Sequence, residues 1–299
     1  MAENSAISWT RHTWNPWMGC TKVSPACDGC YAEALMDKRY GKVQWGPHGE
    51  RVRTGAHTWN DPIRWNRQAE KDGDRPFVFC ASVADIFDNQ VDPQWRSDAF
   101  DVMSNTPNLV YLLLTKRPQN IIKLSQAAGG LPGNAAIGTT VEDQKRADIN
   151  LPALEVAKVG LRPLFTFGSF EPLLGPVVIP PAYMPDWIIT GGETDQGGHK
   201  ARPSHPDWFR SLRDQCAAAG IPFHHKQNGE WIAATEEHEY DTSRGNAGKP
   251  RAFIVATDDT VHCFDNKHAV GGIPMIKIGK KLSGRELDGV THDAFPEVA

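Results

Sequence analysis

Three cysteines near the N-terminus constrain this chain more than any other feature of its sequence. Cys20, Cys27 and Cys30 follow a C-x6-C-x2-C spacing. Glycine and proline between them predict a loop whose backbone can wrap around a compact inorganic centre. Three thiolates are one fewer than a [4Fe–4S] cluster or a structural zinc ion usually takes. We therefore expect a metal centre with one open coordination position.

The spacing alone leaves three interpretations of these cysteines open. One is a [4Fe–4S] cluster with a free iron that can bind a small molecule. Another is a zinc site with three cysteines and one histidine, His12 or His48. The third is a set of ordinary reduced thiols, although clustered cysteines in a reducing compartment usually bind metal.

Composition places the chain among globular proteins with a sizeable core. It has 299 residues, of which 40% are hydrophobic and 23% charged. The sequence shows neither a signal-peptide pattern nor an apolar run of membrane-spanning length, so we expect a cytoplasmic protein without a membrane partner. The other cysteines, Cys80, Cys216 and Cys263, are then separate thiols. A net charge of −4 argues against binding nucleic acid over the whole surface but allows a local basic groove.

Short apolar segments alternate with helical patterns after residue 75. The segments cover residues 77–81, 109–114, 135–139, 163–167, 187–190 and 221–225. This alternation predicts an α/β fold with a parallel sheet, as a full or partial (β/α) barrel. No G-x-G-x-x-G motif follows the first strand, which counts against a dinucleotide-binding fold. We expect the barrel and cysteine loop in residues 1–229, and a C-terminal extension with a hairpin in residues 230–299.

Polar or small residues follow nearly every predicted strand. They are Ser82, Asp85, Thr115, Lys116, Arg117, Thr139, Glu142, Glu171, Gly191, Gly192, Glu193, Lys226 and Gln227. The carboxyl ends of barrel strands converge on one face, where active sites are found. The sequence therefore predicts a polar cavity that faces the cysteine loop.

The cysteine loop continues as Cys30-Tyr31-Ala32 into a predicted helix, and in this it resembles the cluster loop of radical S-adenosylmethionine (SAM) enzymes. In particular, it is similar to their spore-photoproduct-lyase-like branch. A wider match over residues 13–33, 113–118, 138–142, 171–176, 191–193 and 226–227 resembles a phage-associated family of three-Cys-motif proteins with radical-SAM-like character. Two features depart from the general radical-SAM pattern. The first spacing is C-x6-C where C-x3-C is usual, and Gly29 stands where an aromatic residue is common.

This resemblance implies a radical-SAM-type barrel, and an enzyme that cleaves SAM to a 5′-deoxyadenosyl radical and acts on a nucleic acid or nucleoside. It implies an external electron donor and allows for a partner protein. Cys20, Cys27 and Cys30 would hold a [4Fe–4S] cluster. The implied cofactor contacts are Tyr31, Ser82, Asp85, Thr139, Glu142, Gly191, Gly192 and Glu193. The implied catalytic residues are Lys116, Arg117 and Glu171.

Two further function classes compete with this interpretation. One is a nucleic-acid-binding protein stapled by zinc or a cluster, without redox catalysis. The Trp- and Arg-rich residues 41–67 and the phage association favour it. We expect residues 41–76 to be irregular apart from a short helical piece around residues 62–68. The other is a magnesium-dependent hydrolase using Asp85, Glu142, Glu171 and Glu193, which leaves the cysteines unexplained.

Overall fold

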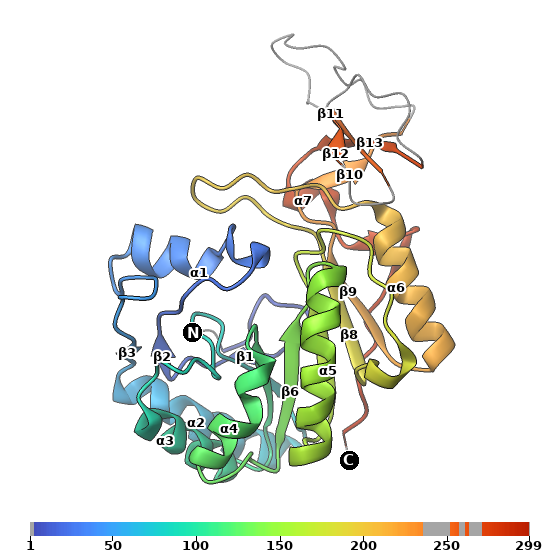
Figure 1. Ribbon diagram of the computed structural model, residues 1–299. Coiled ribbons are helices and arrows are strands. Elements are labelled where there is room, and N and C mark those ends of the chain that lie inside the picture. The colour runs from blue at the N-terminus through green and yellow to red at the C-terminus, as the bar shows by residue number, and fades with distance from the viewer. Residues whose placement is uncertain (1–2, 236–251, 257–260, 263–270, 299) are drawn as a thin grey trace.

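Seven parallel strands form the centre of the protein (Figure 1). The computed structural model describes residues 3–235, 252–256, 261–262 and 271–298. In spatial order the strands are β1 (His12–Thr13), β4 (Phe77–Cys80), β5 (Val110–Thr115), β6 (Ala135–Thr140), β7 (Thr166–Phe170), β8 (Trp187–Gly191) and β9 (Phe223–Gln227). β1 and β9 are the two edges of this sheet, so the barrel is partial. The predicted α/β fold with a partial (β/α) barrel is confirmed.

Helices connect successive strands and cover the outer face of the sheet (Figure 1). They are α2 (Ala56–Asp72), α3 (Pro93–Ser104), η3 (Pro118–Asn120), α4 (Ile121–Ala127), α5 (Gln144–Leu161), η4 (Pro181–Tyr183) and α6 (Pro206–Ala219). Side chains cap three of them. Asp92 accepts from the Gln94 amide at the start of α3, Asp143 accepts from the Arg146 amide at the start of α5, and His205 accepts from the Asp207 amide at the start of α6. α3, α4, α5 and α6 lie between the strands, where the sequence indicated helical patterns, whereas η4 was not predicted and α2 differs from the prediction.

α2 is longer than the sequence indicated. The sequence predicted residues 41–76 to be irregular, with only a short helical piece around residues 62–68. Proline inside a helix removes one backbone hydrogen bond. Pro62 lies inside the 17-residue helix, and the carbonyl four residues earlier, that of Thr58, loses its usual donor. The Trp14 indole donates to that carbonyl at 2.9 Å. A side chain from another segment thus makes the proline tolerable, which no local pattern could indicate.

The two faces of the sheet are both apolar, as expected for parallel strands. Val78, Tyr111 and Ile137 point outward to the helices. Phe79, Leu112 and Trp187 point inward and fill the lower part of the barrel. Trp9 from the N-terminal segment packs on Phe79 with ring centroids 4.7 Å apart and helps to close this inner core. The upper part of the barrel, at the carboxyl ends of the strands, is therefore the part left for a polar cavity.

Between β1 and α2 lies the cysteine loop (residues 20–30). It follows β2 (Trp17–Met18), which pairs with β3 (Val52–Arg53), and it contains the short η1 turn (Pro25–Cys27). A helix then begins at Tyr31 as α1 (Tyr31–Glu33) and continues as a π-helical segment, η2 (Ala34–Arg39). This is the helix predicted after Cys30.

The C-terminal part forms a small sheet and then returns to the barrel. Its strands are β10 (Trp231–Ala233), β13 (Ile273–Lys277), β11 (Ala252–Val255) and β12 (Val261–His262), in spatial order. β11 and β12 are antiparallel, as the predicted hairpin requires, and its expected turn at 257–260 lies outside the described residues. After α7 (Lys280–Ser283), β14 (Glu286–Leu287) and β15 (Val290–Thr291), the tail packs Phe295 on Trp187. Within the described ranges, no helix is long and apolar enough to span a bilayer.

Candidate functional site

A cavity of about 840 Å³ opens at the carboxyl ends of the strands, and all three cysteines line it. The strand ends contribute Ser82, Asp85, Lys116, Glu171, Gly192, Glu193, Lys226 and Gln227 to the same wall. Tyr31 also lines the cavity, and its hydroxyl donates to the Ser82 carbonyl. Polar strand ends and the cysteine loop therefore face one another, as the sequence predicted.

Thr139, Glu142, Gly191 and Arg117 are not on the cavity wall. All six residues of β6 are buried, and Thr140 rather than Thr139 reaches the cavity, because neighbouring strand residues point to opposite faces. Thr139 instead donates to the Thr115 carbonyl at 3.1 Å. Glu142 is 1% exposed and accepts a hydrogen bond from the Ala26 amide at 3.3 Å. Its contact is with the cysteine loop, not with the cavity.

The three cysteines are free thiols. Burial raises the pKa of Cys20 to about 11 and also raises that of Cys30. Binding of a metal centre would reverse this preference, because a coordinating thiol is deprotonated. Among the described residues, no three His, Cys, Asp or Glu side chains form a group that could hold a metal ion. This argues against a ready-made zinc site, whose four ligands surround one ion closely.

A four-iron cluster makes a different demand on the same thiols. Iron and sulfide atoms lie between its thiolates, so the sulfurs need wider spacing than around one ion. Cys20, Cys27 and Cys30 share the wall of one cavity that has room for such a group. Two cations compensate the charge of the thiolates. Arg117 donates to the Cys20 sulfur, and thiolates of Cys27 and Cys30 help to raise the pKa of Lys116 against the opposing effect of its burial. The donor set therefore fits a cluster.

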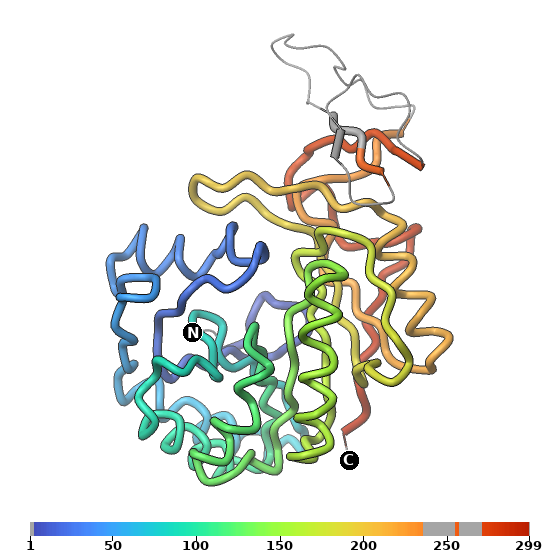
Figure 2. Tube along the Cα trace, viewed as in Figure 1, coloured from blue at the N-terminus to red at the C-terminus, as the bar shows by residue number. Residues whose placement is uncertain are grey.

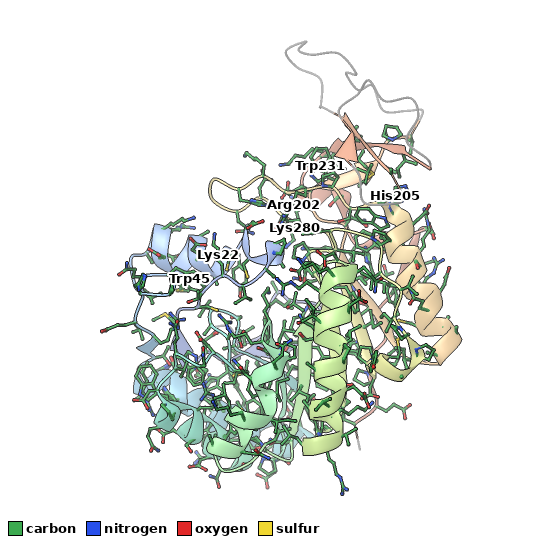
Figure 3. The ribbon with its side chains drawn as sticks, viewed as in Figure 1. Lys22, Trp45, Arg202, His205, Trp231 and Lys280 are labelled. Atoms are coloured by element: carbon green, nitrogen blue, oxygen red, sulfur yellow. The ribbon has the colours of Figure 1, made fainter. Side chains whose placement is uncertain are left out.

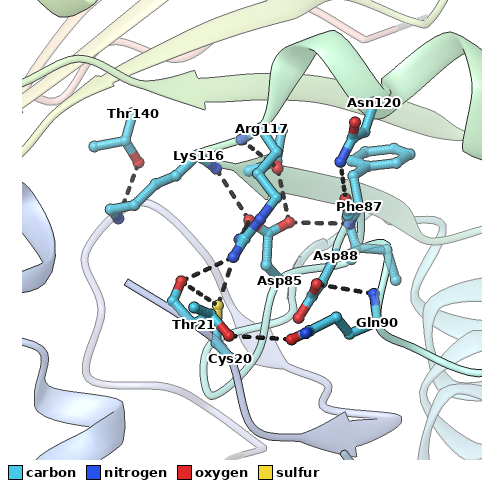
Figure 4. Close-up of polar contacts among 12 residues, drawn as sticks. Cys20, Thr21, Asp85, Phe87, Asp88, Gln90, Lys116, Arg117, Asn120 and Thr140 are labelled. Atoms are coloured by element: carbon cyan, nitrogen blue, oxygen red, sulfur yellow. Dashed lines mark hydrogen bonds and ion pairs between the residues drawn. The ribbon is translucent and has the colours of Figure 1, made fainter. Parts of the chain in front are cut away.

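Arg117 connects Cys20 to the end of β5 (Figure 4). Its Nη1 donates to the Cys20 sulfur at 3.5 Å and to Asp85 Oδ2 at 2.8 Å. Asp85 also accepts from the Thr115 hydroxyl at 2.7 Å and from the Phe87 amide at 2.9 Å. These hydrogen bonds hold the Asp85 carboxylate in one orientation, so Asp85 in turn fixes Arg117 in place.

Three arginines from different β/α units hold the backbone of the cysteine loop. Arg117 Nη2 donates to the Thr21 carbonyl at 2.8 Å, and Arg146 Nη2 donates to the Val23 carbonyl at 2.9 Å. Arg202 Nη2 donates to the Pro25 carbonyl at 2.9 Å. The accepting carbonyls belong to alternate residues of the long x6 interval. Side chains of the barrel therefore hold the backbone of this long interval in place. Neither Arg146 nor Arg202 was among the residues expected at the site.

Glu171 is the centre of a second set of polar contacts on the cavity wall. Lys226 Nζ donates to both of its carboxylate oxygens at 2.7 and 2.9 Å, and Gln227 Nε2 donates to Oε1 at 2.8 Å. The glycine pair after β8 makes room for this arrangement. A Cβ on Gly191 would lie 3.0 Å from the Glu171 carboxylate, and one on Gly192 would lie 2.1 Å from the Asn228 carbonyl oxygen. Glycines at these positions thus allow close packing within the protein.

Glu193 is buried, and Arg202 satisfies its carboxylate. Oε2 accepts from the Arg202 amide and Nε, each at 2.8 Å, and Oε1 accepts from Nη2 at 2.6 Å. Although burial alone would raise the pKa of Glu193, these hydrogen bonds lower it. His199 Nε2 lies 3.2 Å from Glu193 Oε1. An amino group of a ligand would have to share this carboxylate with Arg202.

The same group of residues explains why Gly29 differs from the expected aromatic residue. A Cβ on Gly29 would lie 2.6 Å from His199 Cδ2 and 3.2 Å from Glu193 Oε1. His199 thus occupies the space into which a side chain at position 29 would extend.

The histidines considered as zinc ligands lie elsewhere. His12 is buried and stacks on Trp65 with ring centroids 4.4 Å apart, and its Nδ1 accepts a hydrogen bond from the Asn4 amide. His48 is exposed. Neither lines the cavity with the cysteines, so neither is placed to act as a fourth ligand. Of the early tryptophans, Trp14, Trp17 and Trp65 are core residues, while Trp45 lines the cavity.

The chain belongs to the family DUF5131, described as "Protein of unknown function", whose model matches residues 4–296. None of the curated proteins matches the sequence. Among solved structures it is similar to spore photoproduct lyase at low identity. A cysteine-to-serine variant of that protein has a TM-score of 0.47 and 12% identity, covering 93% of this chain and 71% of the other. A variant with bound AdoMet and dinucleoside spore photoproduct has a TM-score of 0.45 and 12% identity, covering 82% and 68%. Membership in the phage-associated three-Cys-motif family stays a prediction.

Proposed function

We propose that this protein is a radical-SAM-type iron–sulfur enzyme that acts on a nucleic acid or a nucleoside-like substrate. The observation that carries the proposal is the shared cavity: Cys20, Cys27 and Cys30 line it together with the polar strand ends. Three thiolates leave a four-iron cluster one open position for SAM. At about 840 Å³ the cavity lies at the upper end of the range for small-molecule sites, which leaves room for a substrate group.

The chain's own residues would bind and orient the reactants. A reduced cluster would supply, when bound, the electron that cleaves SAM to a 5′-deoxyadenosyl radical, and an external electron donor would reduce it. Lys116, whose Nζ has Thr140 Oγ1 at 3.3 Å, offsets thiolate charge and can hold a carboxylate. Glu171, fixed by Lys226, presents a carboxylate to hydroxyl or amino groups in the cavity. A contact of Glu193 with the SAM amino group stays a prediction.

The charge of the cavity supports an anionic substrate. Six residues of its wall are Lys or Arg and three are Asp or Glu, whereas the whole chain has a net charge of −4. Each of the three acids is paired with a cation: Asp85 with Arg117, Glu171 with Lys226, and Glu193 with Arg202. The remaining cations include Lys116 and Lys280, so the wall attracts negative charge. Phosphate groups of a nucleotide would match it.

Anaerobic preparation and chemical reconstitution test this proposal. We expect about four iron and four sulfide per chain, with substoichiometric zinc. Reduction with dithionite in the presence of SAM should then yield 5′-deoxyadenosine, measured by chromatography. One zinc per chain without iron would instead identify the metal-stapled nucleic-acid-binding protein. A complete cluster that neither binds nor cleaves SAM would rule out the radical mechanism and leave the cluster assignment intact.

Arg117 should raise the reduction potential of the cluster. Its cationic N–H group faces the Cys20 sulfur, and such a contact stabilises the reduced, more negative form. Arg117→Gln should therefore lower the midpoint potential by tens of millivolts, where about 59 mV is a tenfold change for one electron. The measurement is a redox titration followed by electron paramagnetic resonance. Arg146→Gln is the matched control, because Arg146 holds the Val23 carbonyl. Equal potentials in both variants would contradict this role.

A further inference from the structure

Residues 193–202, which follow β8, form a loop that the C-terminal sheet holds firmly. Asp195 accepts hydrogen bonds from the Ala201 amide at 2.8 Å and from Lys277 of β13. The Glu230 amide donates to the Glu193 carbonyl at 3.0 Å. Trp231, which Figure 3 shows at the C-terminal sheet, donates through Nε1 to the Ala201 carbonyl at 2.8 Å. The base of the 193–202 loop is thus fixed to β10 and β13.

The other side of the 193–202 loop contacts the cysteine loop and the helix after it. Figure 2 shows the loop extending from the C-terminal sheet toward the N-terminal helical segment. Gln196 and His199 exchange backbone hydrogen bonds at 3.2 and 2.9 Å, which makes the tip a tight turn. A Cβ on Gly197 in this turn would be 3.7 Å from the Ala34 Cβ. Thr194, Gln196 and Gly197 also line the cavity, so the loop forms part of its wall.

Arg202 makes the polar connection between the two loops. Its Nη1 donates to Asp28 Oδ2 at 3.1 Å, its Nη2 to the Pro25 carbonyl at 2.9 Å, and its Nε to Glu193. One guanidinium therefore joins a carboxylate of its own loop to a backbone group and a side chain of the cysteine loop. Hydrogen bonds with ionised partners are the stronger ones, and the planar fork fixes direction as well as distance.

We infer that Arg202 is a positioning residue, which holds residues 25–30 in their ligating arrangement before any metal is bound. The 193–202 loop transmits this support from the C-terminal sheet to Cys27 and Cys30. The inference rests on the proposed function only for the purpose of this arrangement, which would be to bind a cluster. The contacts themselves are present in the metal-free chain. It gives the C-terminal extension a role in cluster assembly, although its small sheet contributes no cysteine ligand.

Hydrogen–deuterium exchange of the metal-free full chain tests the inference. The amides of Cys27 and Asp28 donate to the carbonyls of Ser24 and Pro25. In Arg202→Gln, these two amides should exchange about ten to a hundred times faster than in the unaltered protein. Arg210→Gln is the matched control. Arg210 pairs with Asp207 and Asp288 and does not contact the cysteine loop. Unchanged exchange at residues 25–30 in Arg202→Gln overturns the inference, whether or not the unaltered protein binds a cluster.

Substitutions at the contact between Gly29 and His199 provide a second test, which leaves the charge of Arg202 in place. Gly29→Ala places a Cβ against the His199 ring and should also speed exchange at residues 25–30. Adding His199→Ala removes that ring and should restore most of the protection. No effect of Gly29→Ala, or no restoration in the double variant, would contradict the proposed packing of the two loops.

Iron content separates this inference from the proposed function. If the unaltered protein takes up a cluster, Arg202→Gln should lose iron to a chelator at least about tenfold faster. If the unaltered protein binds no iron, the proposed function fails while the exchange result still decides the role of Arg202. Iron retention equal to that of the unaltered protein, despite faster exchange, would show that the support does not serve the metal.

Discussion

Replacing Cys27 or Cys30 with alanine is expected to abolish the visible absorption of the reconstituted protein and to reduce its iron content to background. Each cysteine is one of only three thiolates that line the cavity in the described chain, and a cluster already lacks its fourth protein ligand here. Losing a further thiolate leaves two irons without protein ligands. The visible absorption of the cluster and assays of iron and sulfide measure the loss.

Cys216→Ala is the control for this prediction. Cys216 is buried on α6, on the outside of the barrel, and lies away from the cavity wall. Its substitution removes a thiol that is buried like that of Cys27 without touching the cysteine loop, so iron content should stay unchanged. If Cys27→Ala and Cys216→Ala retain the same iron, the cluster is not held by the cysteine loop.

The fold was predictable because parallel strands buried on both faces appear as continuous apolar runs. The segment over 110–115 is such a run, and helical periodicity follows it. For the same reason, the sequence does not indicate where such a strand begins or which of its residues face the cavity. The fourth predicted segment, 163–167, is observed as β7 (Thr166–Phe170), because Leu164 is apolar but precedes the ladder. β6 is buried at every position, so its sequence does not indicate that Thr140 rather than Thr139 faces the cavity.

The sequence predicted the wall residues that directly follow strands. It did not predict residues that contact the cysteine loop from distant positions in the sequence. Lys116, Glu171 and Glu193 line the cavity as expected, because strand ends converge on one face. Arg202 reaches Asp28 across 174 positions of sequence, and it lies in a segment without periodicity. A charge in such a segment usually belongs to a solvated surface. Only the three-dimensional structure shows that Arg202 satisfies Glu193 and supports the cysteine loop.

A second large effect is expected for stability, from the ion pair beneath Cys20. Arg51 and Asp88 have side chains only 2% and 1% exposed and approach to 2.6 Å. Arg51 also donates to the Gly49 carbonyl at 2.8 Å and to the Thr21 hydroxyl at 2.9 Å. Arg51→Met would leave Asp88 buried without its cation, so the free energy of unfolding should fall by about 3–5 kcal/mol. Urea unfolding followed by circular dichroism measures the change.

Arg11→Met provides the exposed counterpart. Arg11 pairs with Asp74, and their side chains are 51% and 40% exposed, so its loss should cost about 1 kcal/mol or less. Adding Asp88→Leu to Arg51→Met removes the unpaired carboxylate and should recover part of the stability, because two apolar groups replace the buried pair. Equal losses in Arg51→Met and Arg11→Met would show that the buried pair adds no more than an exposed one. A larger loss, with recovery in the double variant, would instead show that the cost comes from the buried Asp88 carboxylate left without its cation, since the hydrogen bond from Arg51 to Thr21 is absent from both variants.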